Sequence, residues 1–189
     1  AGLALLILSI GYWAGRFTSL TPANVEPETT QKTETPASTS ATTPENGVDG
    51  RVTYRSVTGE VAADDGARII LLPVHREGSL KIPSAGLREN DSNADRRGAE
   101  AIIDSIGGAS GFADSTGRFM IPLSQPGEYV VLVLSNSASR SDDTTTTDAE
   151  ELLADYFERP SAVLGELAFH TSRIRLRERG TSPLDVTFR

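Results

Sequence analysis

Short apolar segments separated by turn residues recur from Val48 to the end of the chain. In residues 51–55 (RVTYR), apolar and polar residues alternate, as they do in a strand with one buried face. Residues 67–73 (ARIILLP) form an almost continuous apolar run, which is typical of a strand covered on both faces. Residues 128–135 (EYVVLVLS) carry the strongest strand pattern in the chain. We therefore predict a strand in each of these segments.

Further strands are predicted at a hairpin and near the end of the chain. Residues 111–114 and 118–123 flank the polar turn Ser115–Thr116–Gly117, and a glycine turn between short β-prone segments indicates a hairpin. Residues 167–178 and 183–188 supply two late strands. Because Gly and Pro turns join these segments without alternating helices, the pattern predicts a mainly β, antiparallel β-sandwich of about seven strands.

Two peripheral helices interrupt the strands. Ser92 is a suitable N-cap for residues 93–106, whose apolar residues recur at helical spacing and which two glycines follow. Residues 147–157 begin with a Thr and a Glu spaced as a capping box, and an Arg–Pro pair after them is expected to end the helix. We expect both helices to pack on the sandwich.

The first residues of the chain form an uncharged apolar run, residues 1–15 (AGLALLILSIGYWAG). Tyr12, Trp13 and Arg16 stand at its end, where interfacial aromatic residues and a cationic flank are expected. A helix of this length reaches about 22 Å, less than the ~30 Å of a bilayer core, so we interpret residues 1–17 as part of a membrane helix that begins upstream. A cleaved signal peptide is the alternative, although no basic segment precedes the run.

Residues 18–47 are dominated by Thr, Pro, Ser, Glu and Ala, and Leu20 and Val25 are their large aliphatic residues. Such a segment cannot bury enough surface to offset the entropy of ordering it, so a disordered linker is predicted. Residues 48–189 then form one head domain. The whole is expected to be a single-pass membrane protein with an extracytoplasmic head.

Composition excludes several kinds of chemistry. The 26 acidic residues outnumber the 18 Lys and Arg, giving a net charge of −8, which disfavours a nucleic-acid partner. The absence of cysteine excludes disulfides, a thiol nucleophile, thiolate zinc sites and iron–sulfur clusters. His75 and His170 are the only histidines and neither stands in a recognisable motif. No catalytic residue, cofactor or metal site is predicted, and we expect no enzyme activity.

Four short motifs occur in a familiar order: GRV at 50–52, GARI at 66–69, ADSTGRF at 113–119 and PGEYV at 126–130. In these pieces the head resembles the carboxypeptidase regulatory-like domain family. That resemblance implies a Greek-key, transthyretin-like (prealbumin-like) β-sandwich, with Phe119 directed into the core. These are scaffold motifs, so the resemblance says little about function.

The chain departs from the family pattern in two places. Residues 74–109 are an insertion that holds the first helix, and residues 136–165 are a helical extension. Proteins of this resemblance include accessory domains of carboxypeptidases and separate modules of bacterial envelope proteins. We expect the individual properties of this chain to lie in these two segments.

One charge feature has a regular spacing, a row of arginines at alternate positions: Arg173, Arg175, Arg177 and Arg179. On a strand these side chains share one face, where their guanidinium groups can bind a polymer that carries phosphates or carboxylates. A charged solvent face or a guarded edge strand gives the same pattern and is the alternative interpretation.

Acidic residues suggest a metal site in two places. Residues 91–95 (DSNAD) match the first half of a calcium loop, but Arg96 and Ile102 stand where a glycine and a glutamate are needed, so a helix cap is preferred. The acidic loop 142–151 contains five carboxylates: Asp142, Asp143, Asp148, Glu150 and Glu151. Such a loop can bind a divalent cation, or can simply favour the start of the following helix.

The predicted function follows from the order of anchor, linker and sandwich. We expect a non-enzymatic, membrane-tethered module that is structural or binds a ligand, a protein or a polymer. The alternative is a metal-dependent or enzymatic head domain that uses the acidic loop 142–151.

Overall fold

A computed structural model describes residues 46–189, except for residues 77, 89 and 142–143. The predicted membrane helix at 1–17 and nearly all of the predicted linker therefore lie outside the described residues. Within the described part, no helix is long and apolar enough to cross a membrane.

The first sheet has four strands: β1 (Asn46–Arg55), β2 (Val61–Ala63), β5 (Arg118–Pro122) and β8 (Gly180–Phe188). β1 pairs antiparallel with β2 and β5 and parallel with β8. The parallel pair corrects the prediction of a wholly antiparallel fold. It arises because the chain leaves the second sheet after β7, and β8 then joins the first sheet beside β1.

The second sheet has the order β4 (Ala109–Phe112), β3 (Arg68–Pro73), β6 (Gly127–Ser139) and β7 (Leu167–Leu176). All its pairs are antiparallel. β3 is buried at every position, which confirms the prediction of a strand covered on both faces.

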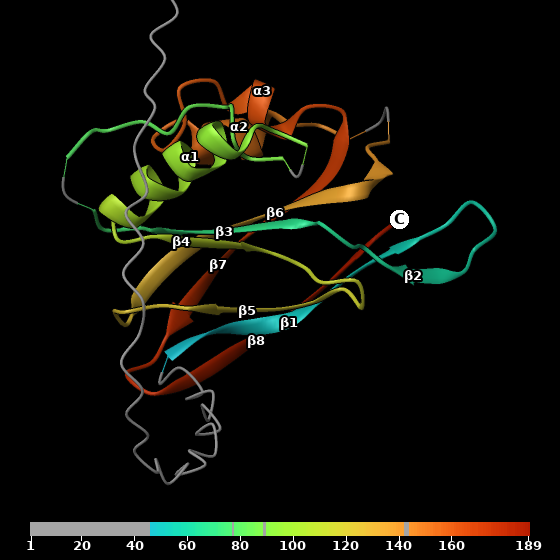
Figure 1. The fold of residues 1–189 in the computed structure, drawn as a ribbon, viewed down its shortest axis with the longest axis horizontal. Coiled ribbons are helices and arrows are strands. Elements are labelled where there is room, and N and C mark those ends of the chain that lie inside the picture. The colour runs from blue at the N-terminus through green and yellow to red at the C-terminus, as the bar shows by residue number, and fades with distance from the viewer. Residues whose placement is uncertain (1–45, 77, 89, 142–143) are drawn as a thin grey trace, which may run out of the picture. The chain divides into compact units, whose positions relative to one another are not determined.

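The two sheets face each other across a common apolar core (Figure 1). Val52 and Phe119 come from the first sheet, and Leu71, Tyr129 and Val133 come from the second. The burial of Phe119 agrees with its predicted place in the core. The described residues thus form a mainly β, mostly antiparallel domain with two sheets.

Three helices form a further layer on the outer face of the second sheet, α1 (Asn93–Ser105), α2 (Thr147–Leu153) and α3 (Pro160–Leu164) (Figure 1). A second apolar core lies between this layer and β3 and β6. It includes residues of the strands, the helices and the segment between α2 and α3 that are almost completely buried: Ile70, Leu132, Ile103, Leu153, Phe157 and Leu164. Both predicted helical regions therefore pack on the sheet.

The first helix follows its sequence signals closely. Ser92 is the N-cap, and its hydroxyl accepts a hydrogen bond from the Asp95 backbone N–H at 3.1 Å. The helix ends at Ser105, and Gly107 then adopts a φ of 78°, which suits a residue without a Cβ.

The second helix is shorter than predicted, because α2 ends at Leu153 and not at Phe157. The backbone of Ile82 pairs with the chain on either side of Phe157, accepting from Glu158 N–H at 3.0 Å and donating to the Tyr156 carbonyl at 2.8 Å. This pairing draws the chain out of the helical path. Pro160 then begins α3, a position where its missing N–H costs nothing.

The start of α2 also differs from the predicted capping box. Thr146 is the N-cap and makes no side-chain bond to the backbone. Its hydroxyl donates instead to the Glu150 carboxylate at 2.6 Å. The Glu150 carboxylate is therefore held by a side chain at the start of α2.

Candidate functional site

The insertion and the extension, which are far apart in the sequence, contact each other directly. Besides the pairing of Ile82 with Phe157, the Arg76 guanidinium lies 5.0 Å from the centre of the Tyr156 ring and donates to the Asp155 carbonyl. The Lys81 ammonium donates to the Ala154 carbonyl. Residues of the segments 74–109 and 136–165 thus build one layer together.

Arg88 joins this layer to the second sheet. Its guanidinium donates to the carbonyls of Val163 and Leu164 at the end of α3, at 2.9 and 3.1 Å, and to that of Ser135 in β6 at 3.3 Å. Burial lowers the pKa of Arg88, an effect that Asp91 partly offsets. These contacts satisfy helix carbonyls that would otherwise lack partners.

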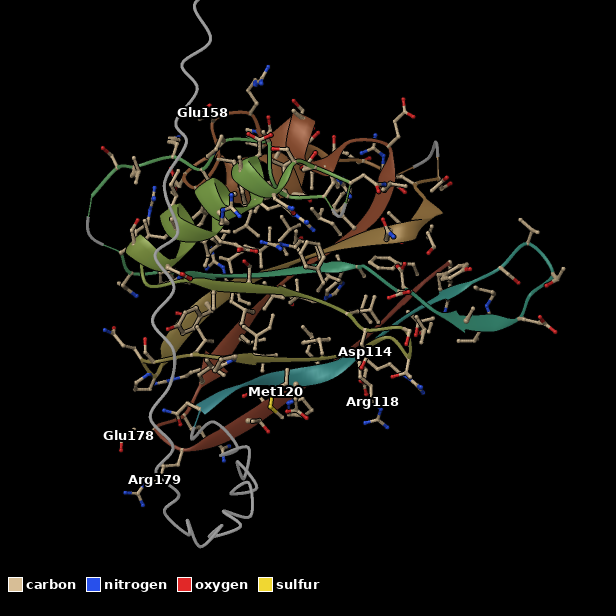
Figure 2. The ribbon with its side chains drawn as sticks, in the orientation of Figure 1. Asp114, Arg118, Met120, Glu158, Glu178 and Arg179 are labelled. Atoms are coloured by element: carbon tan, nitrogen blue, oxygen red, sulfur yellow. The ribbon has the colours of Figure 1, made fainter. Side chains whose placement is uncertain are left out.

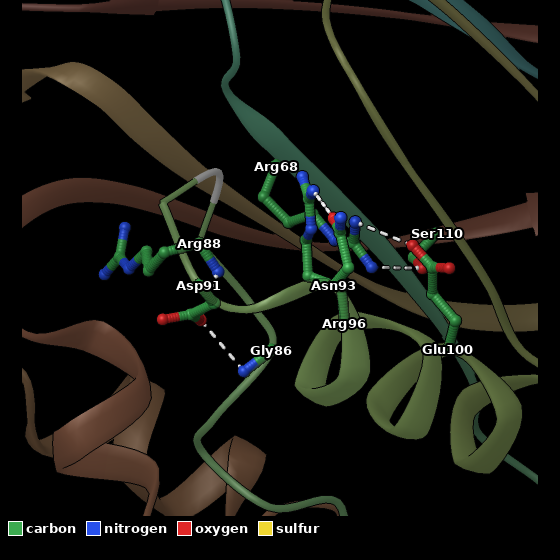
Figure 3. A network of polar contacts seen from close by, with 8 residues as sticks. All are labelled: Arg68, Gly86, Arg88, Asp91, Asn93, Arg96, Glu100 and Ser110. Atoms are coloured by element: carbon green, nitrogen blue, oxygen red, sulfur yellow. Dashed lines mark hydrogen bonds and ion pairs between the residues drawn. The ribbon is translucent and has the colours of Figure 1, made fainter. Parts of the chain in front are cut away.

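Asp91, the first residue of the rejected calcium loop, has a structural role (Figure 3). One of its carboxylate oxygens accepts the backbone N–H groups of Gly86 and Arg88, at 2.8 and 2.9 Å. It therefore stabilises the turn that leads into α1. This agrees with the preference for a helix cap over a calcium loop.

Arg68 lies beneath α1 and is only 1% exposed. Figure 3 shows its bonds to Glu100 and Ser110, at 3.2 and 2.8 Å, and its guanidinium also lies 4.2 Å from the centre of the Phe112 ring. Burial lowers the pKa of Arg68, and the bond to Glu100 opposes that shift. The cluster joins α1 to β3 and β4.

Adjoining cavities form a groove at the end of the second sheet where β3 ends and β6 begins. We call this set of cavities the end groove. Its widest parts have volumes of about 730 and 720 Å³ and share Pro126 and Gly127. The first part is lined by Pro73, His75, Arg76, Asp104, Gln125 and Glu128, among others.

Two smaller cavities continue the end groove toward the helical layer. The part of about 560 Å³ shares His75 and Arg76 with the widest part and reaches Tyr156. The next part, of about 510 Å³, also contacts Tyr156 and lies against α2. Residues at the end of the second sheet, in the insertion and in the extension therefore line a series of adjoining cavities.

Three of the four predicted arginines lie in the end groove. Arg175 and Arg177 line its part beside Pro126, and Arg173 lines its part beside α2. All three are exposed, and within the described part of the chain their guanidinium groups make neither an ion pair nor a hydrogen bond. They are thus free to bind a ligand.

The row of arginines is less regular than the alternation predicted. β7 ends at Leu176, so only Arg173 and Arg175 share a strand face, while Arg177 and Arg179 lie in the turn before β8. Figure 2 shows Arg179 and its neighbour Glu178 projecting from that turn. Arg179 lines none of the cavities of the end groove among the described residues.

The acidic loop reaches the end groove in part. Asp148, Glu151 and Asp155 line the same cavity as Arg173. Asp142 and Asp143 lie outside the described residues. Among the residues that are described, no group of three or more Asp, Glu or His side chains is arranged to hold a metal ion. The described carboxylates therefore give the metal-dependent alternative no support.

The two histidines lie apart. His75 is exposed in the end groove. His170 lies opposite Val133 on the core-facing side of β7 and lines a separate cavity of about 270 Å³ that also touches Arg140 and Arg189. Burial lowers the pKa of His170.

One polar cluster was not found from the sequence. Asp64 is completely buried and accepts hydrogen bonds from the Ser135 hydroxyl at 2.6 Å and the Asn136 backbone N–H at 3.2 Å. Ser135 in turn accepts from the Ala138 N–H at 2.7 Å, where β6 has an irregular register. The sequence showed Asp64 only as a turn residue, and nothing in it marked the distant partner.

Comparison with known proteins adds little to this description. No protein-family model matches the chain, and no curated protein matches it. A crystal structure of a putative carbohydrate binding protein from Pseudomonas aeruginosa is similar to it, with 16% sequence identity and a TM-score of 0.41. That match covers 77% of this chain and 89% of the other. At this score the similarity carries no argument about function.

Proposed function

We propose that the head is a non-enzymatic binding module whose end groove receives an extended chain with acidic groups. The observation that supports this most directly is that Arg173, Arg175 and Arg177 line cavities of the end groove and that, among the described residues, their guanidinium groups form neither an ion pair nor a hydrogen bond. Guanidinium groups present paired donors that match carboxylates and phosphates. Exposed arginines without an internal salt bridge contribute little to stability, so their place in the end groove suits a ligand.

The charge of the end groove is not uniform. Arg175 and Arg177 stand at one end, whereas Asp148, Glu151 and Asp155 line the same cavity as Arg173 at the other. An acidic polymer is therefore expected to be attracted more strongly at the Arg175 end than at the Arg173 end. Because the arginines are exposed, binding is expected to weaken as salt is added.

The triple variant Arg173→Ala, Arg175→Ala, Arg177→Ala is expected to bind acidic polymers at least about tenfold more weakly than the unaltered protein, since each lost charge-assisted bond contributes about 1.5 kcal/mol or more. Titration calorimetry in low salt with polygalacturonate and with polyglutamate measures this loss. The matched control removes three exposed arginines elsewhere: Arg97→Ala, Arg118→Ala and Arg189→Ala. An equal loss in the control, or no binding to either polymer, would contradict the proposal.

Membrane tethering through residues 1–17 is a second part of this proposal and is supported by the sequence alone. The full chain is expected to stay with membranes after carbonate washing. Replacing Leu6 and Leu8 by Asp should release it, because each acidic residue at the centre of a membrane helix costs about 2.5–3.5 kcal/mol. Recovery of the unaltered chain wholly in the soluble fraction would refute the tether.

The finer assignment of the fold is also proposed. We assign the head to a Greek-key, prealbumin-like sandwich of the carboxypeptidase regulatory-like kind. The support is the order of its motifs and the burial of Phe119 and Tyr129, which those motifs contain, in the core between the sheets.

A further inference from the structure

β7 is an edge strand with a backbone free to pair. It stands last in the order of the second sheet, and among the described strands it pairs only with β6. It is ten residues long, whereas β4 at the opposite edge has four residues. The outward N–H and C=O groups of such a strand can pair with another extended chain.

The side chains beside this edge select for acidic residues. Arg173 and Arg175 lie on the same face of β7, and residues two apart in a strand are separated by about 6.8 Å. A strand added beside β7 repeats this spacing, so acidic residues at alternate positions would lie opposite both guanidinium groups. In the neighbouring strand β6, Val130 lies opposite Arg173 and Glu128 lies opposite Arg175. Among the described residues, Glu128 forms no ion pair with Arg175.

The same arginines disfavour pairing of two copies of the protein through this edge. Two β7 strands placed side by side bring guanidinium groups close together, and like charges in facing positions are destabilising. An acidic strand is attracted by the same guanidinium groups. The edge is thus protected against self-association and still open to a partner of opposite charge.

We infer that the β7 edge binds an extended acidic peptide, which joins the second sheet as a fifth strand with acidic residues at alternate positions. This rests on the proposed function and specifies its ligand as a polypeptide. Only a polypeptide supplies N–H and C=O groups at the strand repeat, so it gains main-chain hydrogen bonds that an acidic polysaccharide lacks.

The experiment uses synthetic peptides of about seven residues, roughly the length of a typical strand, in which Glu and Val alternate. Two derivatives carry N-methyl groups, one on every Glu and the other on every Val. Because alternate N–H groups of a strand point to opposite sides, one derivative is expected to lose binding at least about tenfold, and the other is expected to bind like the parent. Calorimetry with the full chain measures both.

Charge reversal gives an independent readout. The double variant Arg173→Glu, Arg175→Glu is expected to lose its binding of the Glu/Val peptide and to bind a Lys/Val peptide of the same length. The reversed protein controls for folding, because gained binding requires an intact head. If the double variant does not bind the Lys/Val peptide, or still binds the Glu/Val peptide as the unaltered protein does, the inference is overturned.

Other outcomes separate the inference from the proposed function. If both N-methyl derivatives bind like the parent, or if polygalacturonate binds and the peptides do not, the added strand is refuted and the anionic groove stands. If neither peptide nor polysaccharide binds, both are refuted. Chemical-shift changes of amides in Leu167–Leu176 on peptide addition are expected, and changes confined to other strands would refute the site.

Discussion

Replacing Phe157 by Ala is expected to lower the free energy of unfolding of the head by about 3–5 kcal/mol. Phe157 is 1% exposed and lies in the second apolar core, between the helical layer and the sheet. Removing its ring leaves a cavity that the surrounding side chains cannot fill. Urea denaturation followed by circular dichroism measures the change.

The neighbouring residue provides the control for Phe157. Glu158 is exposed, and Figure 2 shows it at the outer surface of the helical layer. Glu158→Ala keeps the backbone bond to Ile82 and is expected to change the free energy of unfolding by less than about 0.5 kcal/mol. A loss below about 1 kcal/mol in Phe157→Ala, which is roughly the centre of the distribution for substitutions in general, would show that the layer is not part of the folded core.

The second large effect is expected at Asp64. Asp64→Ala removes the acceptor of the buried Ser135 hydroxyl and the bond from the Asn136 N–H, and it should cost about 2–4 kcal/mol, because an unsatisfied buried hydroxyl costs about 1–3 kcal/mol and a hydrogen bond to a charged group contributes about 1.5–3 kcal/mol. The same denaturation experiment measures it. The irregular part of β6 should also exchange its amide hydrogens faster.

Asp65 offers a matched control for this prediction. It is adjacent and exposed, and its backbone carbonyl accepts from the Asn136 side-chain amide at 3.0 Å, a bond that Asp65→Ala retains. Asp64→Asn keeps an oxygen that can accept one bond and is expected to fall between the unaltered protein and Asp64→Ala. Equal stabilities of Asp64→Ala and Asp65→Ala would contradict the role given to the buried carboxylate.

The strands and the first helix were predictable because their signals are local. The hairpin between β4 and β5 depends on Asp114, whose carboxylate accepts from Thr116 and from the Arg118 N–H, with Gly117 at a φ of 77°. These bonds, chiefly that from the Thr116 hydroxyl, hold the pKa of Asp114 below its usual value. Every partner is within four residues, so the short motif specifies the turn.

Two features escape the local sequence pattern for different reasons. β2 has three residues and no apolar alternation, so its pairing with the end of β1 across a short hairpin leaves no strand signal. The end of α2 differs from the prediction because Ile82, far away in the sequence, pairs with the backbone around Phe157. In that second case tertiary hydrogen bonds overrode the local preference of the chain.

The candidate site also has one part that the local sequence indicates and another part that depends on the tertiary structure. The sequence by itself pointed to Arg173, Arg175, Arg177 and Arg179 as a candidate surface, since spacing at alternate positions is visible in a linear pattern. Only the tertiary structure placed the first three of them beside His75, Arg76 and the carboxylates of α2 in one groove. The physical reason is that a groove forms from segments whose contacts are fixed by burial of a shared core, and no single segment carries that information.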